Sequence, residues 1–156
     1  MISALKVARF LIFLKENDQR GLELSNLKLQ KLLYYCQGYY LARYGKPLFE
    51  ETIEAWRYGP VVPKVYFHYK SFGDLDLKVE SEENDDFFQL EQEKLSVIAY
   101  VWKTLGELSA GTLVDKTHSE SPWLNAWFHS DDKVISNKQI QTYFSKNISE
   151  KMLVSQ

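Results

Sequence analysis

The stretch LKLQKLLYYCQGYYLARYG, residues 27–45, decides how this chain folds, because it predicts one long helix. Its apolar side chains recur at the spacing of a single helical face and are Leu29, Leu32, Leu33, Cys36 and Tyr40. Ser25 or Asn26 precedes the stretch as an N-terminal cap, and Gly45 is a suitable C-terminal stop. The other face of the helix, which we expect to be more hydrated, carries Lys28, Lys31 and Tyr35.

Gly38 lies in the middle of this predicted helix. A glycine there costs roughly 1 kcal/mol relative to alanine. It is either a tolerated weak point or a place where a neighbouring element packs too closely for a side chain. We favour close packing, because the rest of the stretch forms a helix so readily.

Other helices are predicted on both sides of residues 27–45. Apolar spacing indicates one over residues 3–16 and another over residues 95–105. Four shorter helices have recognisable starts, at Pro63, at Ser109, at Ser121-Pro122, and at a capping box formed by Ser136 and Gln139.

Between these helices, two segments favour extended structure. LFEETIEAWRYG, residues 48–59, suggests a hairpin that turns near Glu51 and Thr52, and LDLKVE, residues 75–80, suggests a short strand. The predicted fold is mainly α: a compact multi-helix domain with a small β-hairpin or short-strand insertion, α+β by strict count. We expect residues 1–156 to form a single domain.

Composition narrows the classes of function. Lys and Arg total 19 and Asp and Glu total 21, giving a net charge of −2, which argues against non-specific binding of nucleic acid. Cys36 is the single cysteine, so no intrachain disulfide or multi-cysteine zinc site can form. No apolar run approaches the ~20 residues that span a membrane. The N-terminal segment contains Lys6 and Arg9 and is a poor signal peptide, so we expect a cytoplasmic protein.

The clearest candidate for chemistry is KTHSESPW, residues 116–123, in which His118 and Glu120 straddle a predicted corner between helices. Such a pair can bind a metal or move a proton, or it can tie two helix ends together. His68 and His129 do not complete a recognised metal motif with His118. Nucleophile motifs and glycine-rich phosphate loops are missing from the sequence. We therefore expect no cofactor and no enzymatic activity, and the bracing interpretation is preferred.

Two further observations concern partners. Lys28 and Lys31 could face phosphates if residues 27–45 were a recognition helix, but the stretch is long and aromatic, so DNA binding is not favoured. Aromatic residues make up 15% of the chain, with 10 Tyr, 9 Phe and 4 Trp. Large rings dominate both cores and protein interfaces, so some of them are available for a partner.

Three stretches in order resemble the Panacea antitoxin domain, the family that includes SocA-type antitoxins and phage-associated GepA-like proteins. They are LKLQKLLYYCQGYYLARYGKPLF at residues 27–49, EAWRYGPVVPKVY at 54–66, and THSESPW at 117–123. The residues that carry the resemblance, each with either a structural or a toxin-contacting role, are Lys28, Gln30, Lys31, Tyr35, Gly38, Trp56, Tyr58, Gly59, Pro60, His118, Glu120, Pro122 and Trp123. Among them, Trp56 and Trp123 are expected in the core.

The resemblance implies a bacterial or prophage-encoded antitoxin without enzymatic activity. Its implied partner is a cognate protein toxin, encoded by an adjacent gene and neutralised by direct binding. The alternative is an adaptor that delivers the toxin to a cytoplasmic protease. Residues 73–92, including the acidic segment 80–86, match nothing specific in the family and are expected to form a solvated, partner-specific or variable surface.

Overall fold

The computed structural model describes residues 1–80 and 87–147. The longer helices are α1 (Ala4–Glu16), α2 (Asn26–Tyr44), α4 (Gln92–Leu105) and α7 (Asn137–Asn147). The shorter ones are α3 (Pro63–Tyr69), α5 (Ala110–His118) and α6 (Ser121–His129), with 3₁₀ turns η1 (Lys70–Phe72) and η2 (Phe87–Gln89). The strands are β1 (Ile53–Trp56), β2 (Gly59–Val61) and β3 (Val134–Ile135). The mainly α prediction with a small β insertion is confirmed.

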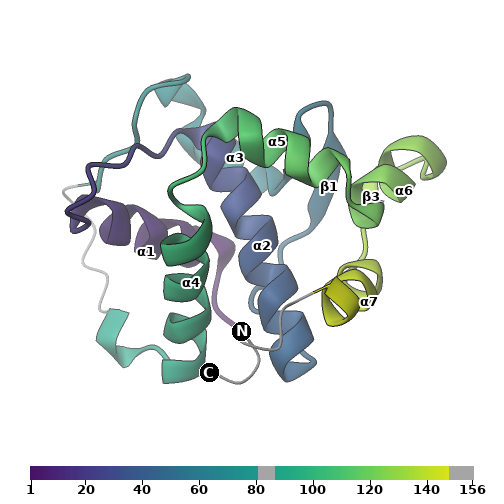
Figure 1. Cartoon of the computed structure of the whole chain (residues 1–156), viewed down its shortest axis with the longest axis horizontal. Coiled ribbons are helices and arrows are strands. Elements are labelled where there is room, and N and C mark those ends of the chain that lie inside the picture. The colour runs from purple at the N-terminus through teal and green to yellow at the C-terminus, as the bar shows by residue number, and fades with distance from the viewer. Residues whose placement is uncertain (81–86, 148–156) are drawn as a thin grey trace.

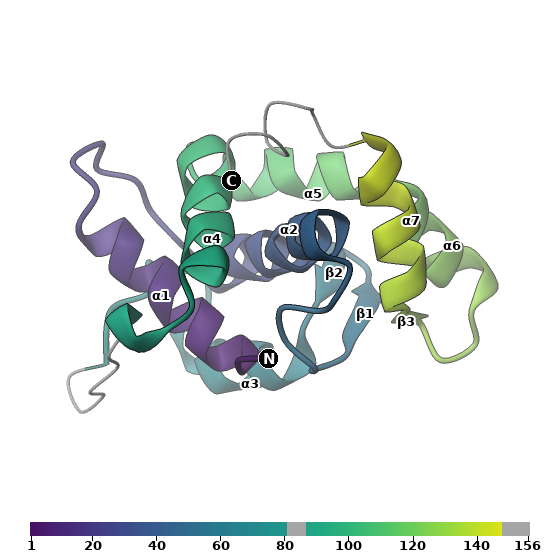
Figure 2. The same ribbon diagram turned by 90° about the horizontal axis from the view of Figure 1, so that it is seen from below.

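Helix α2 runs through the middle of the molecule (Figures 1 and 2) and contacts α1, α3, α4, α5, α7 and β2. The Ser25 hydroxyl caps its first turn, and Gly45 ends it in the left-handed conformation, both as predicted. The expectation of a hydrated face is wrong, because Lys28, Lys31 and Tyr35 are all buried. A helix enclosed on every side must bury its polar side chains too, whatever the spacing of its apolar residues.

The close approach predicted at Gly38 is confirmed. A Cβ atom at this position would lie 2.3 Å from a ring carbon of Phe144 in α7. The phenyl ring of Phe144 fills the space that a side chain on Gly38 would need. The same ring packs against Tyr34 and Tyr35, which lie in α2 with Gly38.

The sheet has the strand order β2-β1-β3 and is antiparallel throughout. The hairpin turns at Arg57 and Tyr58, with Trp56 paired to Gly59, so the predicted turn near residues 51–52 is wrong. Glu51 instead accepts a hydrogen bond from the Ala4 N–H at the start of α1. Residues 75–80 form no strand; Leu77 donates a single backbone bond to Leu24.

The predicted helix starts hold at α3, α5 and α7. Pro63 lies in the first turn of α3, Ser109 caps α5, and the Ser136 hydroxyl accepts from the Gln139 N–H. At α6 the cap residue is Glu120 rather than Ser121, and its side chain makes no capping bond. Within residues 1–80 and 87–147, no helix is both long and apolar enough to cross a membrane. Most of the segment 80–86 lies outside the described residues.

Candidate interaction site at the hairpin turn

The three sequence motifs meet at the turn between β1 and β2. The Trp123 indole N–H donates to the Trp56 carbonyl at 2.8 Å, and the Lys31 ammonium donates to the Pro60 carbonyl at 2.8 Å. His118 Nε2 lies 3.0 Å from the Arg57 carbonyl, and because a carbonyl can only accept, this nitrogen carries the proton. Side chains from α2, α5 and α6 therefore hold the main chain of the turn.

Gly59 is the residue that lets this junction close. Its φ of 108° disfavours any side chain, and a Cβ atom would lie 2.7 Å from the Thr117 hydroxyl and 2.8 Å from Lys31 Cε. The Lys31 side chain, 0% exposed, thus lies directly beneath the turn. Burial lowers the pKa of Lys31 to about 7.

Neither lysine proposed to face phosphates is available for that role. Lys28 is buried, and its ammonium donates to the Glu23 and Gly106 carbonyls. Burial also lowers the pKa of Lys28. The DNA-binding alternative therefore loses the residues on which it depended.

His118 and Glu120 point to different partners. The Glu120 carboxylate is 2% exposed and accepts hydrogen bonds from the hydroxyls of Tyr34 and Tyr35, both at 2.9 Å. Lys116 Nζ lies 3.5 Å from the same carboxylate, while burial raises the pKa of Glu120. His118 stacks on Trp123 with ring centroids 4.2 Å apart.

These contacts tie the α5–α6 corner to the hairpin turn and to α2, and the bracing role of His118 and Glu120 stays a prediction. Across the two described ranges, no cluster of three or more His, Cys, Asp or Glu residues is placed to hold a metal ion. The alternative interpretation of the pair, a small metal-dependent hydrolase, needs both side chains at one site, whereas His118 and Glu120 bond different neighbours.

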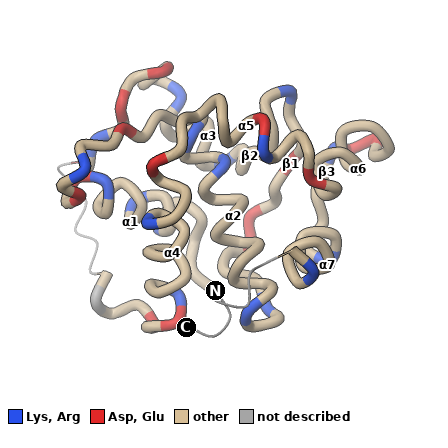
Figure 3. Tube along the Cα trace, in the orientation of Figure 1, with Lys and Arg blue, Asp and Glu red and all other residues tan. Residues whose placement is uncertain are grey.

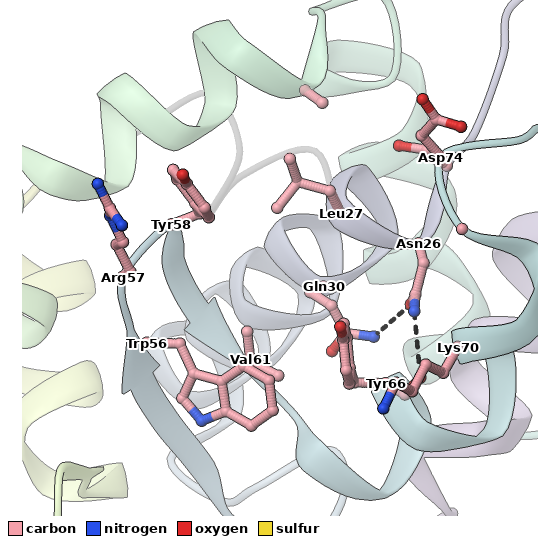
Figure 4. A pocket seen from close by; sticks show the side chains of 13 residues that line it. Asn26, Leu27, Gln30, Trp56, Arg57, Tyr58, Val61, Tyr66, Lys70 and Asp74 are labelled. Carbon is pink, nitrogen blue, oxygen red and sulfur yellow. Dashed lines mark hydrogen bonds between the residues drawn. The ribbon is translucent and has the colours of Figure 1, made fainter.

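A surface groove opens beside this junction (Figure 4), with a volume of about 540 Å³. The hairpin, the start of α2 and helix α3 form its walls, and its lining includes Leu27, Gln30, Trp56, Tyr58, Val61 and Tyr66. Trp56 is half-buried in this wall rather than in the core, whereas Trp123 is buried as expected. Sequence spacing could not separate these two tryptophans, because the groove exists only once α3 packs beside the hairpin.

The floor of the groove is held rigid by amide side chains. Gln30 accepts from the Val62 N–H at 2.9 Å and donates to the Asn26 side chain at 2.9 Å. Asn26 in turn donates to the Tyr66 carbonyl at 3.1 Å. These bonds fix α3 and the end of β2 to α2, so the groove is a feature of the folded chain.

The rim carries large side chains of the kinds enriched at protein interfaces. Tyr58, which lines the groove, is 55% exposed, and Phe67, which lies beside the lining residues Trp56 and Tyr66, is 59% exposed. Trp56, Tyr66 and Phe67 form a chain of ring contacts with centroids 5.0 to 6.1 Å apart. The Arg57 guanidinium lies 5.5 Å from the Tyr58 ring. Arg57, Tyr66 and Phe67 were absent from the predicted site residues. Arg57 and Tyr66 lie within the motif stretch 54–66, whereas the surplus of aromatic residues was the only sequence signal for Phe67.

The motif residues thus divide into two groups. Trp56 and Tyr58 reach the groove surface, and Gln30 forms its floor. The buried remainder supports the turn and the helix contacts and consists of Lys28, Lys31, Tyr35, Gly38, Gly59, Pro60, Glu120, Pro122 and Trp123, with half-buried His118 beside them.

The family described as "Antitoxin SocA-like, Panacea domain" matches residues 29–124, a span that contains the hairpin, the α5–α6 corner and all of the groove lining except Ser25, Asn26 and Leu27. This chain belongs to the SocA-like Panacea family. Antitoxin SocA of Caulobacter vibrioides is 36% identical over 109 residues, which cover 64% of this chain and 58% of that relative. The chain therefore matches little more than half the length of this Panacea relative. No solved structure matches the chain.

Proposed function

We propose that this protein is an antitoxin that neutralises a cognate protein toxin by direct binding, and that the toxin docks on the groove beside the hairpin turn. The observation that carries the proposal is the exposed aromatic rim, formed by Tyr58 and Phe67 around half-buried Trp56. Aromatic and arginine side chains supply most of the energy at protein interfaces. Membership of an antitoxin family supports a toxin as the partner.

The scaffold under this rim favours binding over catalysis. The hairpin turn is held through main-chain carbonyls, so the rim is already ordered before a partner arrives. Preorganisation reduces the entropy lost on association. The buried motif side chains Glu120 and Lys31 are engaged with tyrosine hydroxyls and with the backbone, respectively.

Co-expression with the neighbouring gene tests the function. We expect that gene product to arrest growth alone and to be tolerated when this protein is present. If no neighbouring product is both toxic and rescued, the proposal is wrong.

Alanine substitution tests the surface. Tyr58→Ala and Phe67→Ala should each weaken toxin binding by about 2 kcal/mol, roughly thirty-fold, without loss of folding. Phe128→Ala is the matched control, because Phe128 is 66% exposed on α6 with its ring near Trp123, whereas the ring of Phe67 contacts Trp56 and Tyr66 of the groove lining. Equal losses at Phe67 and Phe128, or no loss at either, would place the toxin elsewhere.

Toxin half-life separates direct sequestration from the adaptor alternative. An adaptor for a cytoplasmic protease shortens the half-life of the toxin in cells, and rescue then depends on that protease. Full rescue with an unchanged half-life supports sequestration.

A further inference from the structure

The groove at the hairpin continues into a second hollow. That hollow, of about 390 Å³, lies between the loop before α2, residues 74–76 and the α4–α5 loop. Ser25, Asp74 and Ala110 line both hollows. Together they form one surface depression, which runs from the hairpin turn to the α4–α5 loop and which we call the long groove.

The two ends of the long groove carry opposite charges. The hollow at the hairpin is lined by two cations, Arg57 on the turn and Lys70 on the opposite wall (Figure 4), the second hollow is lined by Glu23 and Glu107, and Asp74 lines both. Figure 3 shows a basic position at the β1–β2 turn and an acidic one on the α4–α5 loop.

In the part of the chain that the structure describes, the cations of the hollow at the hairpin contact aromatic rings rather than carboxylates. Within the described residues, neither Arg57 nor Lys70 forms an ion pair; Arg57 lies against the Tyr58 ring and Lys70 is 5.7 Å from the Phe67 ring. Both side chains are exposed. No carboxylate of the described residues therefore competes with a partner for these two cations.

The acidic end is only partly compensated: Lys28 and Lys78 interact electrostatically with Glu23, and Arg20 does so with Glu107. In the described structure Glu23 has no ion pair, and Glu107 approaches Arg20 only to 3.9 Å while remaining 63% exposed. Asp76 is already paired with Lys15 and Lys78. The one cation in the lining of this end, Lys28, is buried and donates to backbone carbonyls.

We propose that the long groove binds a single protein segment with an apolar or aromatic centre and opposite charges at its two ends. Its acidic and apolar residues lie in the hollow at the hairpin, beside Arg57 and Lys70 and against Trp56 and Tyr66, and its basic end lies beside Glu23 and Glu107. A nucleic acid is a poor fit, because a phosphate backbone would be repelled along the acidic half. The identification of this segment as part of a toxin rests on the proposed function.

Charge polarity of this kind selects partners more than it adds affinity. Exposed ion pairs are individually weak, and complementary charge mainly fixes register and suppresses wrong partners. The expected signature is a preference, on the order of tenfold, between ligands that differ only in the order of their charges. Salt should reduce that preference.

Two synthetic peptides of identical composition test the proposal on the full chain. One has three Glu at one end, an apolar centre containing Trp, and three Lys at the other end; its isomer has the same centre with Glu and Lys alternating at both ends. Both are fluorescein-labelled and neutral in net side-chain charge, and fluorescence anisotropy measures binding. We expect the blocked peptide to bind about tenfold more tightly, with most of the difference lost in concentrated salt.

Charge reversal in the protein identifies the site. R57E with K70E, or E23K with E107K, should each abolish the preference for the blocked peptide. All four substitutions together should restore it, because a short peptide can bind in the reversed direction. K138E with K146E on α7 is the matched control, since both lysines are exposed and outside the long groove; it should leave the preference intact.

The outcomes separate this inference from the proposed function. Equal affinities for the two peptides, no binding of either, or a preference that survives both double reversals would overturn the polarised groove. Failure of toxin rescue together with an intact peptide preference would overturn the antitoxin proposal alone. Rescue without any peptide preference would overturn only the inference about the segment.

Discussion

Replacing Gly38 by alanine tests how α2 and α7 pack. The new Cβ would stand 2.3, 2.4 and 2.6 Å from three ring carbons of Phe144. Carbon atoms pack best at about 3.5–4.0 Å, so the ring or the whole of α7 has to move by more than 1 Å.

The ring has little room to move. Phe144 is 3% exposed and makes edge-to-face contacts with Tyr34, Tyr35 and Tyr39, at centroid distances of 5.4, 5.8 and 5.5 Å. Overpacking of this kind costs about 1–3 kcal/mol. Alanine regains about 1 kcal/mol of helix propensity. We therefore expect Gly38→Ala to lower the free energy of unfolding by up to about 2 kcal/mol.

Urea denaturation of matched variants measures this balance. Gly111→Ala in α5 is the control, because a Cβ there meets nothing within 4 Å and only the propensity gain remains. Gly38→Ala combined with Phe144→Leu should be less destabilised than the sum of the single variants. The reasoning is refuted if Gly38→Ala stabilises the protein as much as Gly111→Ala does, or if the double variant is additive.

Three further substitutions probe the junction under the hairpin. Burial lowers the pKa of Lys31 to about 7, so between pH 7 and about 10 the unfolded chain binds more protons than the folded chain. The free energy of unfolding of the wild type should therefore rise over that pH range relative to that of Lys31→Met. Denaturation at several pH values measures this difference. Glu120→Ala leaves two buried tyrosine hydroxyls without their acceptor and should lower the free energy of unfolding by about 3 kcal/mol, measurable by thermal and urea melts. His118→Ala loses the stack on Trp123 and the bond to the turn, which should cost about 1–3 kcal/mol in the same melts. Toxin rescue by folded His118→Ala should be unchanged, since a brace does not touch the partner.

Local signals in the sequence predicted most helix ends correctly. Ser25, Ser109 and Pro63 act through bonds or dihedral preferences within a few residues, so their effect is visible in the sequence. Gly38 was informative for another reason: its poor helix propensity conflicted with its surroundings, and such conflicts mark tertiary constraints.

Features that depend on distant partners were mispredicted. The turn at Arg57 and Tyr58 lacks the Asn-Gly or Asp-Gly signature by which a tight hairpin is predicted. Side chains distant in sequence stabilise it instead. Glu51 was wrongly predicted to lie in the hairpin turn. Its hydrogen bond from the Ala4 N–H joins segments far apart in the chain, so local sequence could not reveal it. The hydrated face expected for α2 failed in the same way, since a helical pattern does not say how many neighbours enclose it.

The division between buried braces and exposed rim bears on how toxin specificity can change. Replacing Lys31 or Glu120 leaves a buried carbonyl or hydroxyl without a hydrogen-bond partner. Each such group costs about 1–3 kcal/mol, which is a large share of the free energy of unfolding of a typical protein. Replacing Tyr58 or Phe67 exposes no buried polar group, and surface changes of this kind usually alter stability by less than about 0.5 kcal/mol. Specificity should therefore be changed by substitutions on the rim, and a rim variant that gains a new toxin should melt within a few degrees of the wild type.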